Sequence, residues 1–307
     1  MTRIVSDFIG QIGLSGDPKL LLFALIAAVV NGAIGYGFST LLVPIALLLY
    51  PSRILNPGLV LAEIVLNILS LVINRKAVPT VWRRVLPMML ASLPGIILGV
   101  TLLKSANPNT LRFATYLVLL PLVLLQAAGL RRPLRPGSPA EMPVGFGIGV
   151  LYSCTTISGP PLGLLFNNQG LAQDDFRAAL SLFRVTESVA TAIAYGYLGV
   201  YTPQSVALSA NILPCIIIGI PLGRLLVSAI EPELFRRICM AADACLISFG
   251  LSRLLAGYPQ TASFAYAPMA AVLLLDGVIL YRFLKKRQAL RAQARAAAAA
   301  GSGAKSG

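Results

Sequence analysis

Two glutamates lie inside long apolar runs of the sequence. Glu63 lies within Pro57–Ile73, and Asn67 follows it by one helical turn on the same face. Glu187 lies in a second such run, three residues after Arg184. An ionised side chain at the centre of a bilayer costs at least about 2.5–3.5 kcal/mol, so residues of this kind usually mark an ion or substrate path. Because the chain contains no histidine, we predict that Glu63 and Glu187 carry protons and that Asn67 belongs to the same proton-coupling site.

These ionisable residues also have a purely structural interpretation. Each glutamate could stay neutral and hydrogen-bonded to a neighbouring helix, and Arg184 could form a structural ion pair with Glu187. In the functional interpretation, Arg184 presents a planar fork of N–H donors to a small anion, and Glu187 holds it when the site is empty. Asp243 and Asp276 lie in other apolar runs, and they rank below the glutamates because neither has a counterpart in the duplication described below.

Two segments rich in glycine and hydroxyl side chains interrupt apolar runs, the first at 31–40 and the second at 153–161. Glycine permits backbone conformations that leave N–H groups free, and the start of a half-helix adds the positive end of a dipole. Both features suit an anion, although close helix packing through small residues is the alternative. The predicted substrate-binding residues are Asn31, Gly35, Gly37, Ser39, Thr40, Ser153, Thr155, Thr156, Ser158, Gly159 and Arg184.

The chain carries an internal duplication. An offset of 124 residues, the separation of Glu63 from Glu187, aligns two halves without a gap and places the run Gly95–Leu102 on Gly219–Leu226. Other matching pairs are Gly35 and Gly159, Pro79 and Pro203, Pro108 and Pro232, and Arg112 and Arg236. Apolar matches are common between any two membrane segments, but a shared Glu, Arg and several Gly and Pro are not, so we infer two repeats.

Composition predicts an all-α polytopic membrane protein. Charged residues make up 12% of the chain, against about a quarter in soluble domains. A helical span needs roughly 20 apolar residues, and the apolar runs lack the alternation of barrel strands. Each half contains one broken stretch and three spans, which we place at 20–50, 57–73, 85–103 and 111–130, and at 144–171, 178–198, 206–227 and 235–255. The predicted regions are an N-terminal repeat at 1–142, a C-terminal repeat at 143–257, an extra transmembrane helix within 258–284, and a basic, low-complexity tail at 285–307, disordered from 291.

The distribution of Lys and Arg predicts the orientation. The basic segments 75–84, 131–135 and 285–295 should all be cytoplasmic. An even number of crossings then separates the second segment from the third, so 144–171 must enter and leave on one face as a hairpin of two short helices. The two repeats are then inverted, an arrangement typical of secondary transporters. The alternative is that the broken stretches are kinked single spans.

Other classes of function find little support in the sequence. The net charge of +14 follows the positive-inside distribution and does not indicate a nucleic-acid partner. Without histidine or a CxxC pair the chain offers no common metal site, and we expect no cofactor. It also has no nucleophile elbow and no HExxH motif, so we do not expect an enzyme.

The two breaks carry a resemblance to a known family. They read Gly32-Ala33-Ile34-Gly35-Tyr36-Gly37-Phe38-Ser39-Thr40-Leu41-Leu42-Val43-Pro44 and Ile157-Ser158-Gly159-Pro160-Pro161-Leu162. Over about residues 18–255 the chain resembles the TauE/SafE family of membrane transporters, also called the sulfonate uptake permease family. Its pattern is a glycine-rich break containing phenylalanine, followed by an apolar stretch with a proline. The resemblance implies transport of sulfite, sulfonates or related small organic anions, coupled to protons.

The sequence therefore predicts a secondary transporter of small anions in the bacterial inner membrane, multi-pass, with a cytoplasmic C-terminus. Its expected partners are the anion, protons and the lipid bilayer, and a homo-oligomer is left open. One alternative is an exporter of cations or amino acids in which the glutamates bind the substrate. An alternative of another class is a channel or a structural membrane subunit.

Overall fold

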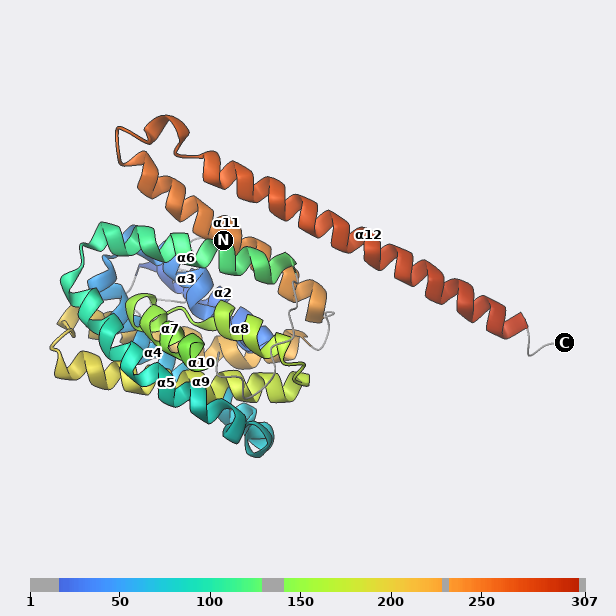
Figure 1. Ribbon diagram of the computed structural model, residues 1–307, viewed down its shortest axis with the longest axis horizontal. Coiled ribbons are helices and arrows are strands. Elements are labelled where there is room, and N and C mark those ends of the chain that lie inside the picture. The colour runs from blue at the N-terminus through green and yellow to red at the C-terminus, as the bar shows by residue number, and fades with distance from the viewer. Residues whose placement is uncertain (1–16, 129–140, 228–231, 304–307) are drawn as a thin grey trace.

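The computed structural model describes residues 17–128, 141–227 and 232–303, and in these residues every regular element is helical (Figure 1). The first half contains α2 (Pro18–Ile34), α3 (Phe38–Leu49), α4 (Ser52–Ile73), α5 (Val78–Ser105) and α6 (Pro108–Ala128). The second half contains α7 (Glu141–Thr155), α8 (Gly159–Asn168), α9 (Gln173–Tyr197), α10 (Pro203–Val227) and α11 (Pro232–Ala256), and α12 (Ala267–Gly303) follows. The expected order of one broken stretch and three longer helices is therefore present in each half.

Within the residues that the structure describes, five stretches are long and apolar enough to cross a membrane. They are Ser52–Ile73, Arg75–Ser105, Pro203–Leu226, Cys239–Ala256 and Ala262–Phe283. Large apolar side chains on their outer faces are exposed, for example Leu90 at 58% and Ile97 at 61%, as expected for helices that face lipid. The helix α9 is long but does not meet the same criterion of composition, since it carries Asp174, Asp175 and the buried Arg184 and Glu187.

Helices of one half pack mainly on helices of the other. In the first half α5 packs on α7 and α9, and their counterparts repeat the arrangement, because α10 packs on α2 and α4. The helices α4 and α9 contact each other, as do α6 and α11. Glycine allows the closest approaches: Gly99 on α5 lies against the Val150 carbonyl, and Gly223 on α10 lies against the Val29 carbonyl. Since lipid tails are as apolar as side chains, close backbone contact of this kind drives helix association in membranes.

The ends of the second broken stretch lie together. Gln169, just after α8, donates a hydrogen bond of 2.7 Å from Nε2 to Oε1 of Glu141, the first residue of α7. The Gln169 carbonyl also accepts a bond of 3.2 Å from Arg84 near the start of α5. The chain therefore returns, after the break, to the end of the bundle from which α7 started.

The C-terminal segment differs from the prediction. We expected no regular structure from residue 291, but α12 continues without interruption to Gly303 and projects beyond the bundle (Figure 1). The physical reason is local, since Ala, Arg, Lys and Gln are among the strongest helix formers. The expectation of disorder was wrong for residues 291–303, and residues 304–307 lie outside the described part.

Candidate functional site

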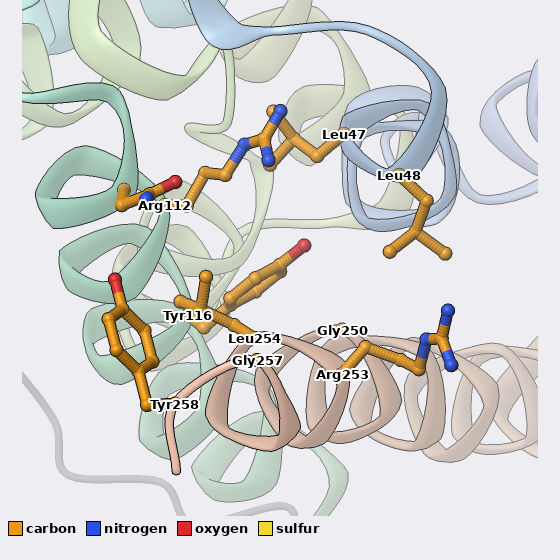
Figure 2. Close-up of a pocket in the computed structure, with 10 residues that line it drawn as sticks. Leu47, Leu48, Arg112, Tyr116, Gly250, Arg253, Leu254, Gly257 and Tyr258 are labelled. Atoms are coloured by element: carbon orange, nitrogen blue, oxygen red, sulfur yellow. The ribbon is translucent and has the colours of Figure 1, made fainter.

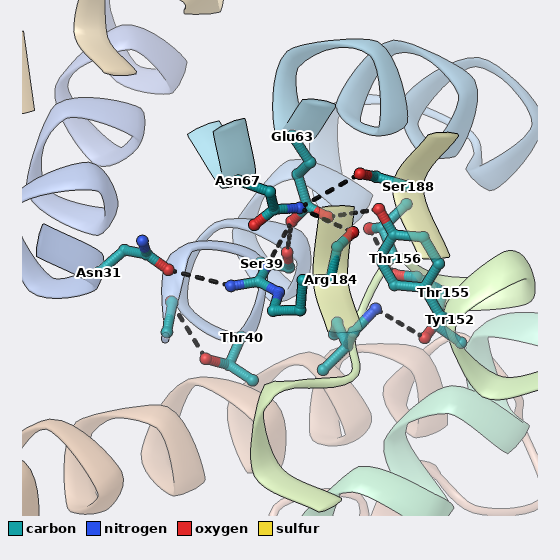
Figure 3. A network of polar contacts seen from close by, with 12 residues as sticks. Asn31, Ser39, Thr40, Glu63, Asn67, Tyr152, Thr155, Thr156, Arg184 and Ser188 are labelled. Carbon is teal, nitrogen blue, oxygen red and sulfur yellow. Dashed lines mark hydrogen bonds and ion pairs between the residues drawn. The ribbon is translucent and has the colours of Figure 1, made fainter. Parts of the chain in front are cut away.

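The first break separates α2 from α3 with two glycines in a left-handed conformation. Gly35 has φ 99° and caps α2, while Gly37 has φ 114° and precedes α3. A residue with a Cβ is strained at such angles, so glycine is the residue that lets the chain turn here. The new helix begins at Phe38, which places the hydroxyls of Ser39 and Thr40 in its first turn (Figure 3).

The second break contains a strained residue. Thr156 has φ 60°, which is unfavourable for a β-branched side chain and is the one positive φ outside glycine in the described ranges. Strain of this kind is often found at functional sites. The Thr155 hydroxyl accepts a bond of 3.1 Å from the Ile157 amide and so stabilises the turn. Gly159 at the start of α8 packs against the Tyr36 ring of the first break, so the two breaks meet.

Arg184 on α9 points into the region where the breaks meet (Figure 3). Its Nη2 lies 3.2 Å from Oε1 of Glu63 on α4, and its Nη1 donates a bond of 3.1 Å to Oδ1 of Asn31 on α2. The exposed fraction of the two charged side chains is 3% and 0%. Arg184 and Glu63 therefore form a buried ion pair in which each charge neutralises the other. Because Arg184 belongs to the second half of the chain and its partners to the first, the guanidinium connects the two halves.

Glu63 uses both carboxylate oxygens. Its Oε1 accepts a hydrogen bond from the Ser39 hydroxyl in addition to the contact with Arg184, and its Oε2 accepts a bond of 2.7 Å from the Tyr152 hydroxyl. The Nδ2 of Asn67, one turn further along α4, donates bonds of 3.3 Å to the Arg184 carbonyl and 3.4 Å to Ser188 Oγ. Four elements, α3, α4, α7 and α9, are thus joined at one carboxylate and its neighbour.

The pairing expected between Arg184 and Glu187 is wrong. Residues three apart on a helix can pair, but the N–H groups of Arg184 are directed at Glu63 and Asn31 on helices of the first half. Glu63 on the neighbouring helix takes that place instead. Glu187 is fully buried, and among the described residues neither of its carboxylate oxygens has a hydrogen-bond partner. The Ser158 hydroxyl lies beside it, but the contact does not meet the geometry of a hydrogen bond.

The remaining predicted hydroxyls are mostly occupied by their own segments. Thr40 donates to the Gly37 carbonyl at 3.1 Å, Ser153 donates to the Gly149 carbonyl at 2.7 Å, and Thr155 donates to the Leu151 carbonyl at 2.7 Å. Bonds of this type compete with any ligand for the hydroxyl proton. The structure therefore brings Asn31, Ser39, Glu63, Asn67 and Arg184 into one network and leaves Ser153, Thr155 and Thr40 bound locally.

Sequence reasoning overlooked Tyr152, and Asp243, which it ranked below the glutamates, is buried as deeply as they are. Tyr152 is fully buried and contacts Glu63 directly, and a tyrosine at the end of an apolar run was the available signal. Asp243 on α11 is fully buried beside the Thr40 hydroxyl, and neither oxygen has a hydrogen-bond partner in the part of the chain that the structure describes. The absence of a repeat counterpart does not reduce the free-energy cost of burying a carboxyl group.

Cavities lead from the network to one end of the bundle. A small cavity of about 20 Å³, enough for about one water molecule, is lined by Asn31, Gly35, Asn74 and Arg224 among others. A wider one of about 790 Å³ shares Asn74 and Arg224 with it and adds Arg75 and Lys76. The wider cavity lies at the segment 75–84, and its lining carries both signs of charge, because it also includes Asp174 and Asp175. The described residues contain no group of His, Cys, Asp and Glu that could hold a metal ion.

Comparison with known proteins identifies the family. The sequence model described as "Sulfite exporter TauE/SafE" matches residues 20–250. A curated relative from Cupriavidus necator, "Probable sulfite/organosulfonate exporter TauE", is 30% identical over 183 residues, which are 57% of this chain and 68% of that protein. No solved structure matches the chain. With a family match over most of its length, this multi-pass membrane protein belongs to the sulfite exporter TauE/SafE family, a family of transporters and not of enzymes.

Proposed function

We propose that this protein is a secondary transporter of sulfite, organosulfonates or closely related small anions, and that Arg184 binds the anion. The observation that carries the proposal is the buried guanidinium of Arg184, held by Glu63 and Asn31 where the two breaks meet. Arginine binds carboxylate, sulfonate and phosphate groups through parallel N–H bonds. The name of the relative from Cupriavidus necator supports the same substrate class.

The proposed coupling to protons follows from competition for Arg184. An anion that binds the guanidinium displaces Glu63 Oε1, which is 3.2 Å away in the structure. A buried carboxylate that loses its cation is strongly disfavoured, so Glu63 takes up a proton as the anion binds. Anion and proton then bind cooperatively, and by linkage each raises the affinity for the other. Glu187 is proposed as a second proton carrier, because it is buried beside Ser158 with no cation paired to it among the described residues.

The proposed architecture is two inverted repeats, 1–142 and 143–257, each a hairpin of two short helices followed by three spans. It is supported by the return of α8 to the start of α7 and by the matched packing of α5 on α7 and α10 on α2. In this topology the C-terminus and the basic segment 75–84 are cytoplasmic. The cavities described above would then lie on the cytoplasmic side of the network, and the small one would have to widen before an anion reached Arg184.

The alternative of a cation or amino-acid exporter requires a glutamate that is free to bind the substrate. Glu63 is not free, since its carboxylate contacts Arg184, Ser39 and Tyr152. A guanidinium at the same place would also repel a cationic substrate. The geometry therefore favours an anion.

Counterflow of radiolabelled methanesulfonate into proteoliposomes tests the proposal. We expect unlabelled methanesulfonate or sulfite inside to drive uptake of label, and Arg184→Lys to weaken the apparent affinity about tenfold, because lysine keeps the charge but loses the planar fork. Arg83→Lys is the matched control, since Arg83 lies over the exposed Trp82 ring outside the network. No counterflow, or unchanged affinity in folded Arg184→Lys protein, would contradict the proposal.

A further inference from the structure

A second cavity with arginine in its lining lies at the opposite end of the bundle from the basic segment 75–84. It has a volume of about 340 Å³ and lies between α3, α6 and α11 (Figure 2). That volume is within the usual range of small-ligand sites, about 300–1,000 Å³. Its lining residues are Leu47, Leu48, Asn109, Arg112, Tyr116, Gly250, Arg253, Leu254, Gly257 and Tyr258.

Two guanidinium groups face this cavity, and no acidic residue lines it. Figure 2 shows Arg112 from α6 and Arg253 from α11 on either side of the hollow, with Tyr116 between them. Neither arginine forms an ion pair within the described ranges. Two like charges around one hollow repel each other, and an anion between them would relieve that repulsion.

Arg112 has hydrogen-bonding capacity left. Its Nη2 donates a bond of 3.1 Å to the Tyr50 carbonyl just after α3, while its Nε is buried and has no partner among the residues described. The start of α6, at Asn109, adds the positive end of a helix dipole. Tyr116 packs its ring on Gly250, and its hydroxyl donates a bond of 3.4 Å to the Pro44 carbonyl. The cavity thus offers N–H donors around a positive centre.

The cavity and its two arginines lie at the same end of the bundle as Arg53 and Lys104. The cavity lies beside Tyr50, at the end of the bundle where α4 begins, whereas Arg75 follows the other end of α4. If the segment 75–84 is cytoplasmic, the two arginines lie on the extracytoplasmic side, where basic residues are disfavoured. The helix α3 connects this cavity to the central network, with Ser39 near its start and Leu47 near its end, about 12 Å apart at 1.5 Å per residue.

We propose that this cavity binds an oxyanion group, such as sulfonate or sulfite, between Arg112 and Arg253 on the extracytoplasmic side of the transporter. That the ligand is the transported anion rests on the proposed function, whereas binding of an oxyanion does not. The shared chemistry also fits the phosphate of a phospholipid, so the test separates the two sources. A bound anion would draw the Arg112 guanidinium from the Tyr50 carbonyl and so act on the end of α3.

Equilibrium dialysis of radiolabelled methanesulfonate against the full-length protein in detergent provides the test. In a Glu63→Gln/Arg184→Gln background, which removes the central pair together, we expect binding of label to remain. Adding Arg253→Gln or Arg112→Lys should then lower the apparent affinity about tenfold, as expected for a lost charge-assisted bond. Arg53→Gln is the control, because Arg53 is an exposed arginine at the same end and bonds the carbonyls of Lys104 and Ala106.

The outcomes separate this site from the central one. Loss of all binding in the Glu63→Gln/Arg184→Gln background, or unchanged affinity on adding Arg253→Gln and Arg112→Lys, would overturn the inference. If these variants instead lose co-purified phospholipid phosphate while methanesulfonate binding stays unchanged, the oxyanion is a lipid head group, and the assignment to the transported anion is overturned. If Arg184→Lys does not change counterflow, that outcome contradicts the proposed function. It leaves the dialysis result on binding between Arg112 and Arg253 unaffected.

Discussion

At the centre of the bundle a guanidinium and a carboxylate lie 3.2 Å apart, out of contact with water. Removing one partner of such a pair typically costs about 3–5 kcal/mol, because the other charge stays buried alone. Arg184 and Glu63 therefore stabilise each other as long as no ligand intervenes. Under the proposed function the pair would act as a switch, since an anion would replace Glu63 at the guanidinium as Glu63 became neutral.

We expect Glu63→Gln to remove most of the pH dependence of anion affinity. In the wild type, a lower pH should strengthen binding of methanesulfonate, because protonation of Glu63 releases Arg184 to the anion. Glutamine preserves the shape and cannot titrate, so affinity should become nearly constant with pH. Methanesulfonate is the appropriate probe, since a sulfonate stays ionised across the range. Flux in proteoliposomes at several pH values is the measurement.

A double-substitution experiment serves as the control on the pairing. Arg184→Ala should lower the melting temperature by leaving Glu63 buried without its cation, and adding Glu63→Gln should restore much of the loss. Adding Glu187→Gln in its place should restore little, because Glu187 does not contact the guanidinium. Wild-type pH dependence of anion affinity in Glu63→Gln would contradict the proposed role of Glu63. Recovery of the Arg184→Ala melting temperature by Glu187→Gln and not by Glu63→Gln would contradict its pairing with Arg184.

At the scale of the elements, small residues decide how closely the helices approach. The helix α7 carries two glycines with opposite surroundings. A Cβ on Gly149 would collide with the Ser92 carbonyl of α5, whereas a Cβ on Gly147 would meet no atom within 4 Å. The first glycine is therefore required by packing, and the second is not.

We predict that Gly149→Ala lowers stability by about 1–3 kcal/mol, the usual cost of overpacking. Gly147→Ala should leave stability unchanged or raise it by up to about 1 kcal/mol, because alanine is the better helix former. Thermal unfolding of the purified variants in one detergent compares them directly. Equal melting temperatures for the two variants would mean that α5 and α7 do not pack as described.

At the scale of the whole molecule, the ends of the broken stretches decide the topology. Gln169 contacts Glu141, so α7 and α8 return to one end, and α9 then leaves from that end at Gln173. The helix α10 starts at the other end, near Gln204. In the proposed topology, with the basic segments inside, we expect Gln173 to be cytoplasmic and Gln204 to be periplasmic.

Cysteine accessibility checks this topology in a background without the four native cysteines. Gln173→Cys should react with an impermeant maleimide only from the cytoplasmic side, and Gln204→Cys only from the periplasmic side. Both side chains are exposed, so a failure to label from one side cannot be attributed to burial of the cysteine within the protein. The reverse pattern would make 144–171 a single crossing, and labelling of both from one side would remove α9 as a span.

The sequence alone determined the helical membrane class and the two breaks, whereas the duplication stays an inference from matched residues. Each follows from local physics: apolar length fits a bilayer, and glycine at Gly35 and Gly37 permits a turn that other residues resist. It also singled out Glu63 and Arg184, because burial of any charge in an apolar run is costly.

Only the tertiary structure decided which residues meet. Helical periodicity places Arg184 and Glu187 within one turn of each other, but it cannot show which neighbouring helix faces the guanidinium. Packing between halves brings Glu63, Asn31 and Tyr152 to one point from three different helices. The same holds for Arg112 and Arg253, which are far apart in the chain and face one cavity because α6 packs on α11.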